Sequence, residues 1–528
     1  MPLLEQALTG ERLDNFVFRE NHKGRRKISE DVLSHIRSES DKFAVVYGLR
    51  RTGKTVAMQQ SICDMTESER KKTAFMTINK KDSIQGLLQE LKKLENEGIR
   101  NIFIDEATFL NDYADICSIF YNYYEKSGFR IVLSGTNSLM FAFSEDSEAY
   151  DRSKRIDSTW IPVSEYNSLL EIEDMEEFFK CAGVLSPYGL PDEPHPFLDR
   201  DRTNRYVYTA IAENIQHSLE NYRNGKRFGL LADLYDQDLL TDVIVRVVED
   251  QNHRFLAKMI NKEFRISSLS AAIGNFSKSD DIEVVAKAIQ ISAKVNIGKI
   301  TNEAITLLKI KDKKVPFTTE QSNEIRQYLE MVDLIRPYHS VNWNNIENSG
   351  RNLFSQQGMR YSHLMAVLVI MEKKLKEFKL QDDEQALLMH AVRSSAFRWM
   401  TEDTVLMDTI GFYGKRNRVF HMSLPKGEFD MVVHDRENRA CDVFEIKNGQ
   451  YLDNRQCRDL ENEDNDKFIE LVCPGCEIRK YVLYNGEPCR KNDINYINIL
   501  SYLSTIQDQT CSFRENMEKL TYTPWGSK

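Results

Sequence analysis

A glycine-rich loop between an apolar run and a helix-like segment constrains the fold of this chain more than any other feature. Residues 42–47, KFAVVY, form a short apolar run typical of a buried parallel strand. The pattern G-x-x-x-x-G-K-T follows at residues 48–55, and VAMQQSICDM continues with helical character. Strand, glycine loop and helix in this order predict a phosphate-binding loop.

The loop supplies the groups that would hold nucleotide phosphates. Its glycines permit a tight backbone path that turns successive N–H groups inward, above the positive end of the following helix. Lys54 would reach the β- and γ-phosphates and assist catalysis, and the Thr55 hydroxyl would ligate Mg²⁺. A chance match in a glycine turn is the alternative, but the flanking strand and helix favour the phosphate loop. The expected nucleotide-binding residues of the loop are Gly48, Leu49, Arg50, Arg51, Thr52, Gly53, Lys54 and Thr55.

A second apolar run ends in two acids, as the metal-binding strand of such a site requires. Residues 101–104, NIFI, are followed directly by Asp105 and Glu106. Asp105 at the strand tip would hold the metal through water, and Glu106 would polarise the attacking water as the catalytic base. The alternative is that both acids only begin a helix, whose first turn favours negative charge.

A third apolar run, RIVL at residues 130–133, leads into the polar sequence SGTN. Thr136 and Asn137 are candidates for nucleotide binding as sensors of the γ-phosphate; the alternative is a turn that caps the next helix. Arg152 and Arg155 follow at a distance where an arginine could stabilise transition-state charge. A solvated basic pair is the commoner explanation for such arginines.

Strands that alternate with helices predict an α/β domain with a parallel sheet and helices on both faces. In such sheets the ligand lies beyond the carboxyl ends of the strands, where the main candidates above fall. At 528 residues the chain is too long for one hydrophobic core, and its length predicts about three or four domains.

Net charge and apolar content restrict the class of protein and the compartment in which we expect it. A net charge of −10 argues against a surface that binds nucleic acid everywhere, but it leaves room for a local basic groove. No segment approaches the ~20 apolar residues of a membrane-spanning helix, and the N-terminus lacks the pattern of a secretory signal. Nine scattered cysteines indicate reduced thiols rather than a disulfide framework. We therefore expect a cytoplasmic protein without membrane contact.

Five segments together resemble prokaryotic AAA+-like P-loop ATPases: GLRRTGKT, IFIDEA, LSGTNS, IPVSEYNSLL and FFKCAGVLSP. The resemblance covers residues 1–190 and implies an ATPase domain that uses ATP and Mg²⁺. The chain departs from the family where Glu165-Tyr166-Asn167 replaces the usual Phe-x-Glu, and where Ala182-Gly183 stands for paired glycines. The arginine that the family carries after its core would fall on Arg155.

Residues 191–345 are predicted to form a helical region with a winged helix. A connection rich in Pro and acids at 185–202 precedes a helical pattern at 206–259. Between residues 296 and 338, a helix-like unit, a basic run, a second helix and an extended segment resemble the winged helix that the family carries after its ATPase core. This unit would contact DNA or serve only for packing. A further basic run, HKGRRK at 22–27, is typical of a solvated turn.

A second candidate site lies near the C-terminus, in GEFDMVVHDRENRACDVFEIKNGQ at residues 427–450. Two strand-like runs flank a polar turn and predict a β-hairpin. Side-chain alternation would present Asp430 beside Glu445, with Lys447 on the same face. An Asp followed by Glu-x-Lys on the next strand resembles the PD-(D/E)xK nuclease arrangement, so we predict a C-terminal α/β restriction-endonuclease-like domain over 346–528.

This set of side chains suits phosphodiester cleavage. Asp430 and Glu445 would bring a divalent metal to the scissile phosphate, and Lys447 would stabilise developing charge or position the attacking water. Glu402 on an upstream helix and Gln456 after the hairpin are further candidates for the site. The alternative is a solvated ion pair between Glu445 and Lys447, and such domains can also keep the fold without cleavage.

The segment CPGC, with Cys473 and Cys476, is typical of a zinc knuckle. Cys457 and Cys489 could complete the ligands. A second C-x-x-C pair is absent from the sequence, which favours a tight turn with free thiols.

The two motif sets in one chain predict a protein that binds and hydrolyses ATP and couples nucleotide state to nucleic-acid binding or metal-dependent cleavage. DNA is the favoured nucleic acid over RNA, and a homo-oligomer is compatible with this hypothesis. Two rivals remain open. One is an ATP-switched binding or signalling protein with a catalytically inactive nuclease-like domain, and the other is an assembly module that ATP stabilises.

Overall fold

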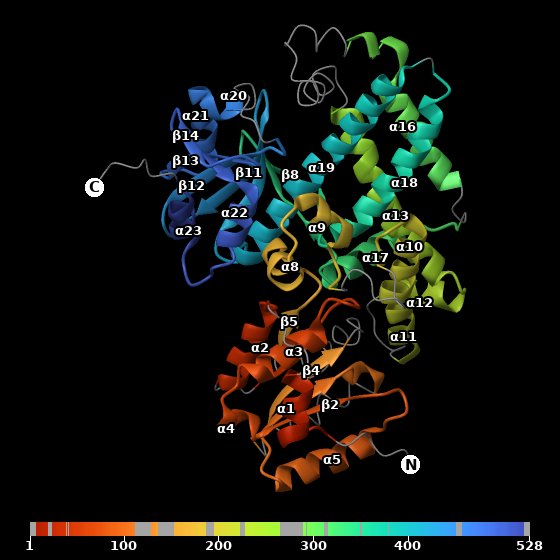
Figure 1. Ribbon diagram of the computed structural model, residues 1–528, viewed down its shortest axis with the longest axis vertical. Coiled ribbons are helices and arrows are strands. Elements are labelled where there is room, and N and C mark those ends of the chain that lie inside the picture. Colours follow the sequence, from red (N-terminus) through yellow and green to blue (C-terminus); the bar gives the residue numbers. More distant parts are fainter. Residues whose placement is uncertain are drawn as a thin grey trace.

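The computed structural model describes the chain except for residues 1–6, 19–23, 39, 41, 111–127, 136–152, 186–194, 222–227, 264–288, 292, 311–314, 349–350, 379, 450–456 and 522–528. Figure 1 shows an N-terminal part in red and orange, a helical part in yellow to teal, and a C-terminal part in blue. Among the described helices, none combines the length and hydrophobicity that crossing a bilayer requires.

The N-terminal part is built on a five-stranded sheet in the order β2-β3-β4-β1-β5. Each neighbouring pair is parallel, so all the strands end at the same edge. The predicted parallel α/β fold is therefore confirmed for this part of the chain. The strands are β1 (Phe43–Tyr47), β2 (Thr73–Thr77), β3 (Asn101–Asp105), β4 (Arg130–Gly135) and β5 (Ser153–Asp157).

Alternating side chains of this sheet enter two separate cores. Phe43 and Val45 of β1 pack on the face that α5 covers, while Ala44 and Val46 pack on the face of α1, α2 and α3. Helices thus cover both faces, as expected for a buried parallel sheet. The helices are α1 (Gly10–Phe18), α2 (Ile28–Arg37), α3 (Lys54–Cys63), the short α4 (Glu67–Arg70) and α5 (Ile84–Asn96), with the 3-10 turn Ala107–Phe109 after β3.

The middle of the chain is helical, as predicted. A π-helical stretch, Tyr208–Ala212, joins the first two of its helices into one rod. The helices are α10 (Arg200–Val207), α11 (Glu213–Asn221), α12 (Gly229–Asp236), α13 (Leu240–Glu263), α16 (Ile297–Ile310) and α17 (Thr319–Met331).

The expected winged helix is divided between two cores. α17 packs on α12 and leads into β6 (Ile335–Pro337), which pairs with β9 (Asn352–Phe354). α16 instead packs on α13 and α18 in a different core. Residues 311–314 of the basic run lie outside the described residues. The helix–strand half of the predicted unit therefore exists, but α16 and α17 do not form one compact module.

The C-terminal part is built on a mixed eight-stranded sheet in the order β14-β15-β13-β12-β11-β10-β7-β8. β10, β11 and β12 form an antiparallel meander, and β13 lies parallel to β12 after the crossover helix α21. The predicted hairpin is present, as β11 and β12. The strands are β7 (Ser340–Asn342), β8 (Glu347–Asn348), β10 (Arg418–Ser423), β11 (Glu428–Asp435), β12 (Ala440–Ile446), β13 (Glu477–Tyr484), β14 (Cys489–Lys491) and β15 (Ile494–Asn498).

Helices cover both faces of this second sheet. One face packs on α20 (Arg458–Glu461) and α21 (Glu463–Val472). The other face joins a large core that also holds the helical part of the chain. The helices of this core that follow β9 are α18 (Gln357–Leu375), α19 (Asp382–Tyr413), α22 (Ile499–Thr505) and α23 (Phe513–Leu520).

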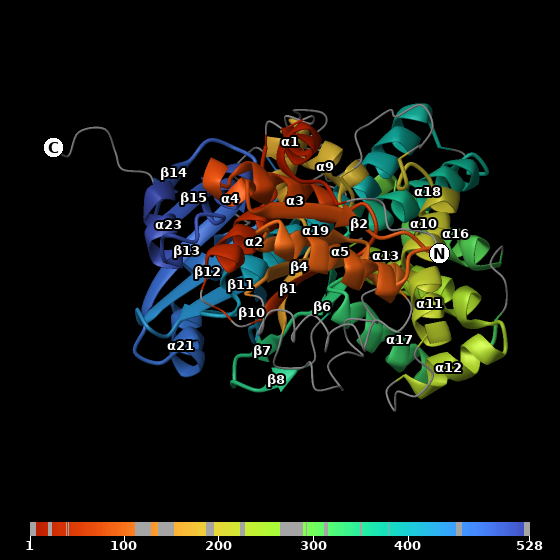
Figure 2. The same ribbon diagram turned by 90° about the horizontal axis from the view of Figure 1, so that it is seen from below.

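The two helices that follow β5 belong to the same large core rather than to the parallel sheet. α8 (Val163–Leu170) packs on α22, and α9 (Met175–Cys181) packs on α18. Figure 1 shows both helices between the N-terminal part and the two other parts, and Figure 2 shows the same arrangement from below. The predicted ATPase segment, 1–190, therefore extends past its own sheet into the core of its neighbours.

Candidate functional site

The loop after β1 adopts a path that only particular residues allow. Gly48 has φ +146°, and a Cβ atom there would lie 2.3 Å from Ser158 Oγ. Gly53 has φ +78° and precedes α3. Arg51 also lies in the left-handed region, with φ 64°. The glycine spacing in the sequence thus corresponds to a real steric requirement, and a side chain at Gly48 would force the loop away from the end of β5.

Lys54 begins α3 and is buried beneath the loop. Its Nζ donates hydrogen bonds to the carbonyl oxygens of Gly48, at 3.1 Å, and Leu49, at 2.8 Å. Burial lowers the pKa of Lys54 to about 8, although Glu106 and Asp105 oppose the shift. A bound polyphosphate would favour the charged ammonium and raise this pKa.

Thr55 and Asp105 supply neighbouring oxygen atoms at the carboxyl edge of the sheet. The Thr55 hydroxyl donates to Asp105 Oδ2 at 2.7 Å, and Ser134 at the end of β4 donates to the other oxygen. Hydroxyl and carboxylate oxygens are the ligands that Mg²⁺ prefers, and Mg²⁺ is commonly held by few protein groups plus phosphate and water. The donor set therefore fits the predicted metal. Ser134 is a residue that the sequence analysis did not single out.

Glu106 follows β3 in a left-handed backbone conformation, with φ 55° and ψ 34°. Such conformations in residues other than glycine cluster at functional sites, because they hold a side chain in one direction. Arg155 is exposed on β5 opposite Val45, before the strand reaches the carboxyl edge. Thr136, Asn137 and Arg152 lie outside the described residues.

Comparison with known proteins supports the chemistry of this edge. Residues 40–167 match the family described as "AAA domain". This part of the chain therefore resembles an AAA domain. The match covers less than half of the chain and includes the loop, both acids and β5. It supports binding and hydrolysis of ATP by this part of the protein, and AAA ATPases typically use Mg²⁺.

No curated protein matches the chain. Among solved structures, the S. cerevisiae Hsp104–ADP complex is 11% identical, with a TM-score of 0.27, and the alignment covers 76% of this chain and 61% of that one. Cdc6p from Pyrobaculum aerophilum is 13% identical, with a TM-score of 0.26 and coverage of 69% and 99%. The chain thus spans about three fifths of the Hsp104 chain. Scores this low establish no common overall architecture.

The predicted residues of the second site lie together on the β11–β12 hairpin. Lys447 Nζ lies 2.5 Å from Glu445 Oε2 and 3.8 Å from Asp430 Oδ2. Asp430 Oδ2 also accepts the backbone N–H of Ile446 at 2.7 Å. Burial acts to lower the pKa of Lys447, but Glu445 and Asp430 outweigh it, and the net shift is upward. Glu445 is buried and Lys447 is only partly exposed, so the alternative of a solvated ion pair is wrong.

Glu402 on α19 adds a third acid beside the hairpin. Burial raises its pKa to about 6, opposed by Arg351, and the charge of Asp430 contributes to the rise. Arg351 forms an ion pair with Glu402 and lies 2.9 Å from Asp403. Arg360 of α18 pairs with the other oxygen of Asp403. No local sequence pattern marks either arginine, and both bring positive charge to the acids of the site.

The acids of the hairpin do not form a metal cage as they stand. Within the described residues, no group of three His, Cys, Asp or Glu side chains is arranged to hold a metal ion. Mg²⁺ needs only one or two carboxylates with water and phosphate, so Asp430 and Glu445 fit it if Lys447 turns aside. Gln456, the further candidate, lies outside the described residues.

The four cysteines considered for zinc do not come together. Cys457 Sγ lies 3.2 Å from the Tyr496 hydroxyl, and Cys489 pairs with Tyr496 across the β14–β15 ladder. Cys473 and Cys476 lie at the other end of α21, beside His434 and Cys441. Cys457 and Cys489 therefore lie apart from the CPGC pair and do not complete its ligands.

A basic residue that was expected to be solvated is buried instead. Arg26 is 0% exposed and forms an ion pair with Glu165 of α8 at 2.7 Å. It also donates to the carbonyl oxygen of Ser158 at 3.2 Å. The sequence offered no signal for this contact, because the two partners lie 139 residues apart.

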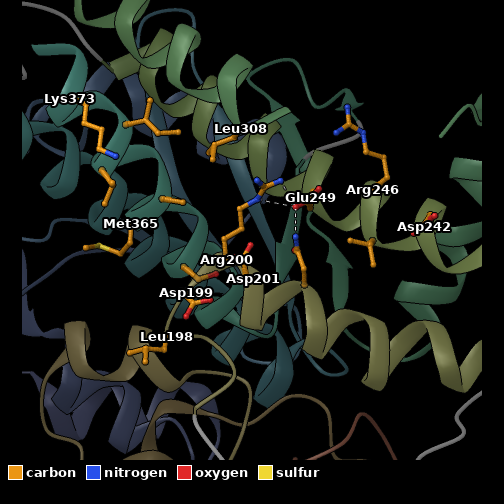
Figure 3. Close-up of a pocket in the computed structure, with 16 residues that line it drawn as sticks. Leu198, Asp199, Arg200, Asp201, Asp242, Arg246, Glu249, Leu308, Met365 and Lys373 are labelled. Carbon is orange, nitrogen blue, oxygen red and sulfur yellow. Dashed lines mark hydrogen bonds and ion pairs between the residues drawn. The ribbon is translucent and has the colours of Figure 1, made fainter. Parts of the chain in front are cut away.

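A cavity of about 700 Å³ lies away from both sites, between α10, α13 and α18. Figure 3 shows Arg200 and Glu249 facing each other in it, joined by hydrogen bonds of 3.0 and 2.6 Å. Asp201, Asp242, Arg246 and Lys373 also line it, together with apolar side chains such as Leu308. This mixture of charges selects no particular ligand, and none of the predicted site residues lines the cavity.

Proposed function

We propose that this protein is an ATPase that couples nucleotide state to the binding and metal-dependent cleavage of nucleic acid, with DNA the favoured substrate. The observation that carries the nuclease half is that Lys447 Nζ lies 2.5 Å from Glu445 and 3.8 Å from Asp430 on the hairpin. Glu402 of α19 lies near enough to Asp430 for that charge to add to the effect of burial in raising the pKa of Glu402.

The nucleotide half rests on the AAA domain. Thr55 and Asp105 would hold Mg²⁺, and the backbone N–H groups of the loop would bind the phosphates. Lys54, with a pKa near 8 in its present surroundings, becomes a full positive charge beside them. Glu106 would accept a proton from the attacking water.

In the proposed nuclease site, each side chain would have one role. A divalent metal, when bound by Asp430 and Glu445, would offset the negative charge of the scissile phosphate. Lys447 would then be released from Glu445 and stabilise the charge that develops on the phosphate oxygens. Glu402, with a pKa of about 6, would exchange a proton near neutral pH.

Two connections support coupling between the sites. The first runs through residues 158–163, which we name the connecting segment. Ser158 Oγ lies 2.8 Å from Thr52 Oγ1 in the phosphate loop. At the other end, the Trp160 indole N–H and the Val163 N–H both donate to Asp408, at 3.0 and 3.1 Å. Asp408 lies on α19, about 9 Å along the helix from Glu402.

The second connection runs through the helical part of the chain. The Tyr206 hydroxyl donates to the carbonyl oxygen of Arg50 in the phosphate loop at 3.0 Å. Gln356, at the start of α18, donates to that hydroxyl at 3.1 Å. One turn later in α18, Arg360 pairs with Asp403 beside Glu402. A movement of the loop on nucleotide binding would therefore reach the second site along α18 as well as α19.

The test is a cleavage assay with labelled DNA and RNA, in Mg²⁺ or Mn²⁺, with and without ATP. We expect cleavage of DNA by the native protein and by Lys480→Ala, a control on β13 whose side chain pairs with Asp466. Lys447→Ala should lose cleavage, and Lys54→Ala should lose the effect of ATP on it. An unchanged rate in Lys54→Ala would disprove coupling, and no cleavage under any condition would disprove the nuclease.

One observation favours a second candidate, an ATP-switched binding protein that does not cut. The acids of the second site already have internal cations: Lys447 beside Glu445 and Asp430, and Arg351 beside Glu402. A site neutralised in this way is stable without metal. Retained DNA binding, responsive to ATP, in a protein that never cleaves would support this candidate.

A further inference from the structure

The β11–β12 hairpin carries a second group of reactive side chains at the end opposite to Asp430 and Glu445. His434 of β11 and Cys441 of β12 are directly paired in the antiparallel ladder, so their side chains lie on one face of the sheet. The turn after α21 brings Cys473 and Cys476 to the same place. Three thiols and one imidazole thus meet, from two strands and one turn.

Contacts between the members show how closely they approach. Cys476 Sγ lies 3.5 Å from His434 Nε2. Cys473 lies beside both Cys441 and His434. Cys441, Cys473 and His434 are buried, with exposed fractions of 0%, 1% and 8%, while Cys476 is partly exposed. A metal could therefore enter from the side of Cys476.

The imidazole of His434 is incompletely satisfied in this setting. Its Nδ1 is buried without a hydrogen-bond partner. The contact with Cys476 is made by the other ring nitrogen, so Nε2 is the atom placed to bind a metal.

We propose that His434, Cys441, Cys473 and Cys476 bind a zinc ion. Three cysteines and one histidine are a common ligand set of structural zinc, and CPGC has the C-x₂-C spacing of a zinc knuckle. The sulfur–nitrogen separation of 3.5 Å between Cys476 and His434 equals what two ligands at about 2.3 and 2.0 Å from a tetrahedral zinc would show.

The side chains need only a small rearrangement to close the site. The described residues contain no ready-made metal cage, so the four ligand atoms do not yet surround one point. Each cysteine has one side-chain torsion, and a change of rotamer redirects its sulfur while the backbone stays in place.

The ion would fasten the hairpin to the element that follows it. Two ligands belong to β11 and β12, and two follow the helix that covers their shared face. Zinc would thereby fix α21 over the face that carries Glu445 and Lys447. This role is structural and does not depend on the proposed nuclease activity.

The experiment measures zinc in the full-length chain, purified under reducing conditions without chelators, by elemental analysis and by release to a chromogenic chelator. We expect about one zinc per chain. Cys473→Ser/Cys476→Ser should lose it, and the matched control Cys457→Ser/Cys489→Ser should keep it. His434→Asn should release zinc to the chelator at least about tenfold faster.

A second measurement needs no variant. The native chain, stripped and reloaded with Co²⁺, should show the visible absorption of a tetrahedral thiolate complex. Absence of both zinc and this absorption would overturn the proposal, as would a Cys441–Cys473 disulfide in a metal-free protein. Equal loss of zinc from the control pair would assign the metal to other cysteines and overturn it as well.

Discussion

The two candidate sites surround a lysine side chain with opposite kinds of partner. In the nucleotide site, the buried cation Lys54 is held by carbonyl oxygens, and burial depresses its pKa to about 8. In the hairpin site, Lys447 lies against two carboxylates, and its pKa is raised. The first site therefore gains when an anion arrives, while the second already holds a cation beside its acids.

This difference predicts how each site responds to its ligand. A polyphosphate would bring the nucleotide site the negative charge that Lys54 lacks. A metal at the hairpin must first displace Lys447, so metal binding there competes with an internal ion pair. Nucleotide-driven movement of α18 or α19 would alter that competition through Arg360, Arg351 and Asp408. Coupling would therefore act by changing how strongly the two carboxylates hold Lys447.

The largest expected effect tests whether the nucleotide site is catalytic rather than only a binding site. Glu106→Gln should retain nucleotide binding but lower ATP turnover by ~100-fold or more, because the base that accepts the proton is lost. Phosphate release and a fluorescent-nucleotide titration would measure the two quantities. Glu97→Gln, an exposed acid after α5, is the control. Turnover within a factor of two of the native rate would remove Glu106 from the mechanism.

The next effect compares the two buried lysines directly. Lys447→Met leaves the buried Glu445 and the partly exposed Asp430 without their cation and should lower the free energy of unfolding by about 3 kcal/mol. Lys54→Met removes a cation whose hydrogen bonds go to carbonyl oxygens and whose desolvation outweighs the attraction of Glu106 and Asp105, so it should leave stability unchanged or raise it. Thermal unfolding without nucleotide would measure both variants. Equal destabilisation would show that the contrast between the sites is wrong.

The smallest effect concerns Asp408 of α19, which accepts hydrogen bonds from Trp160 and Val163 of the connecting segment. Burial raises its pKa from 3.8 to about 7, opposed by hydrogen bonds from Val163 and Trp160. The folded protein holds this proton more tightly than the unfolded chain, so the stabilisation is complete below pH 4 and is lost as pH rises through 7. For each pH unit within this window, the free energy of unfolding falls by at most about 1.4 kcal/mol.

Asp408→Asn keeps the size of the side chain and removes the titration. The difference in unfolding temperature between the native protein and this variant should therefore shift steadily against the native protein from pH 4 to pH 7. Parallel curves for the two proteins would show that Asp408 does not carry the proton.

The sequence predicted the nucleotide site well because its parts are local. Gly48, Gly53, Lys54 and Thr55 lie in one loop, and Asp105 ends one apolar run, so strand ends alone bring them together. The hairpin site was equally predictable from the sequence, because alternation along two strands places Asp430 beside Glu445. Which of these residues act in catalysis stays a prediction.

Other features depend on contacts between distant segments, which no local pattern encodes. Val163 and Asp408 lie 245 residues apart, and Arg351 and Glu402 lie 51 apart. The same cause explains the burial of Arg26 and the grouping of the cysteines. The basic neighbours of Arg26 predict solvation, whereas an ion pair with the distant Glu165 decides its burial, and a strand pairing decides which thiols meet.

The position of α8 and α9 restricts where recombination could join this ATPase to another protein. The covalent order assigns these helices to the ATPase, but their apolar side chains are buried against α18 and α22. A crossover at residue 190 between two related genes would deliver both helices into a foreign core, where their shapes would not match. A crossover near residue 158 would leave that core intact. Modular exchange of this ATPase is therefore constrained to a junction inside the segment that its sequence motifs mark as one unit.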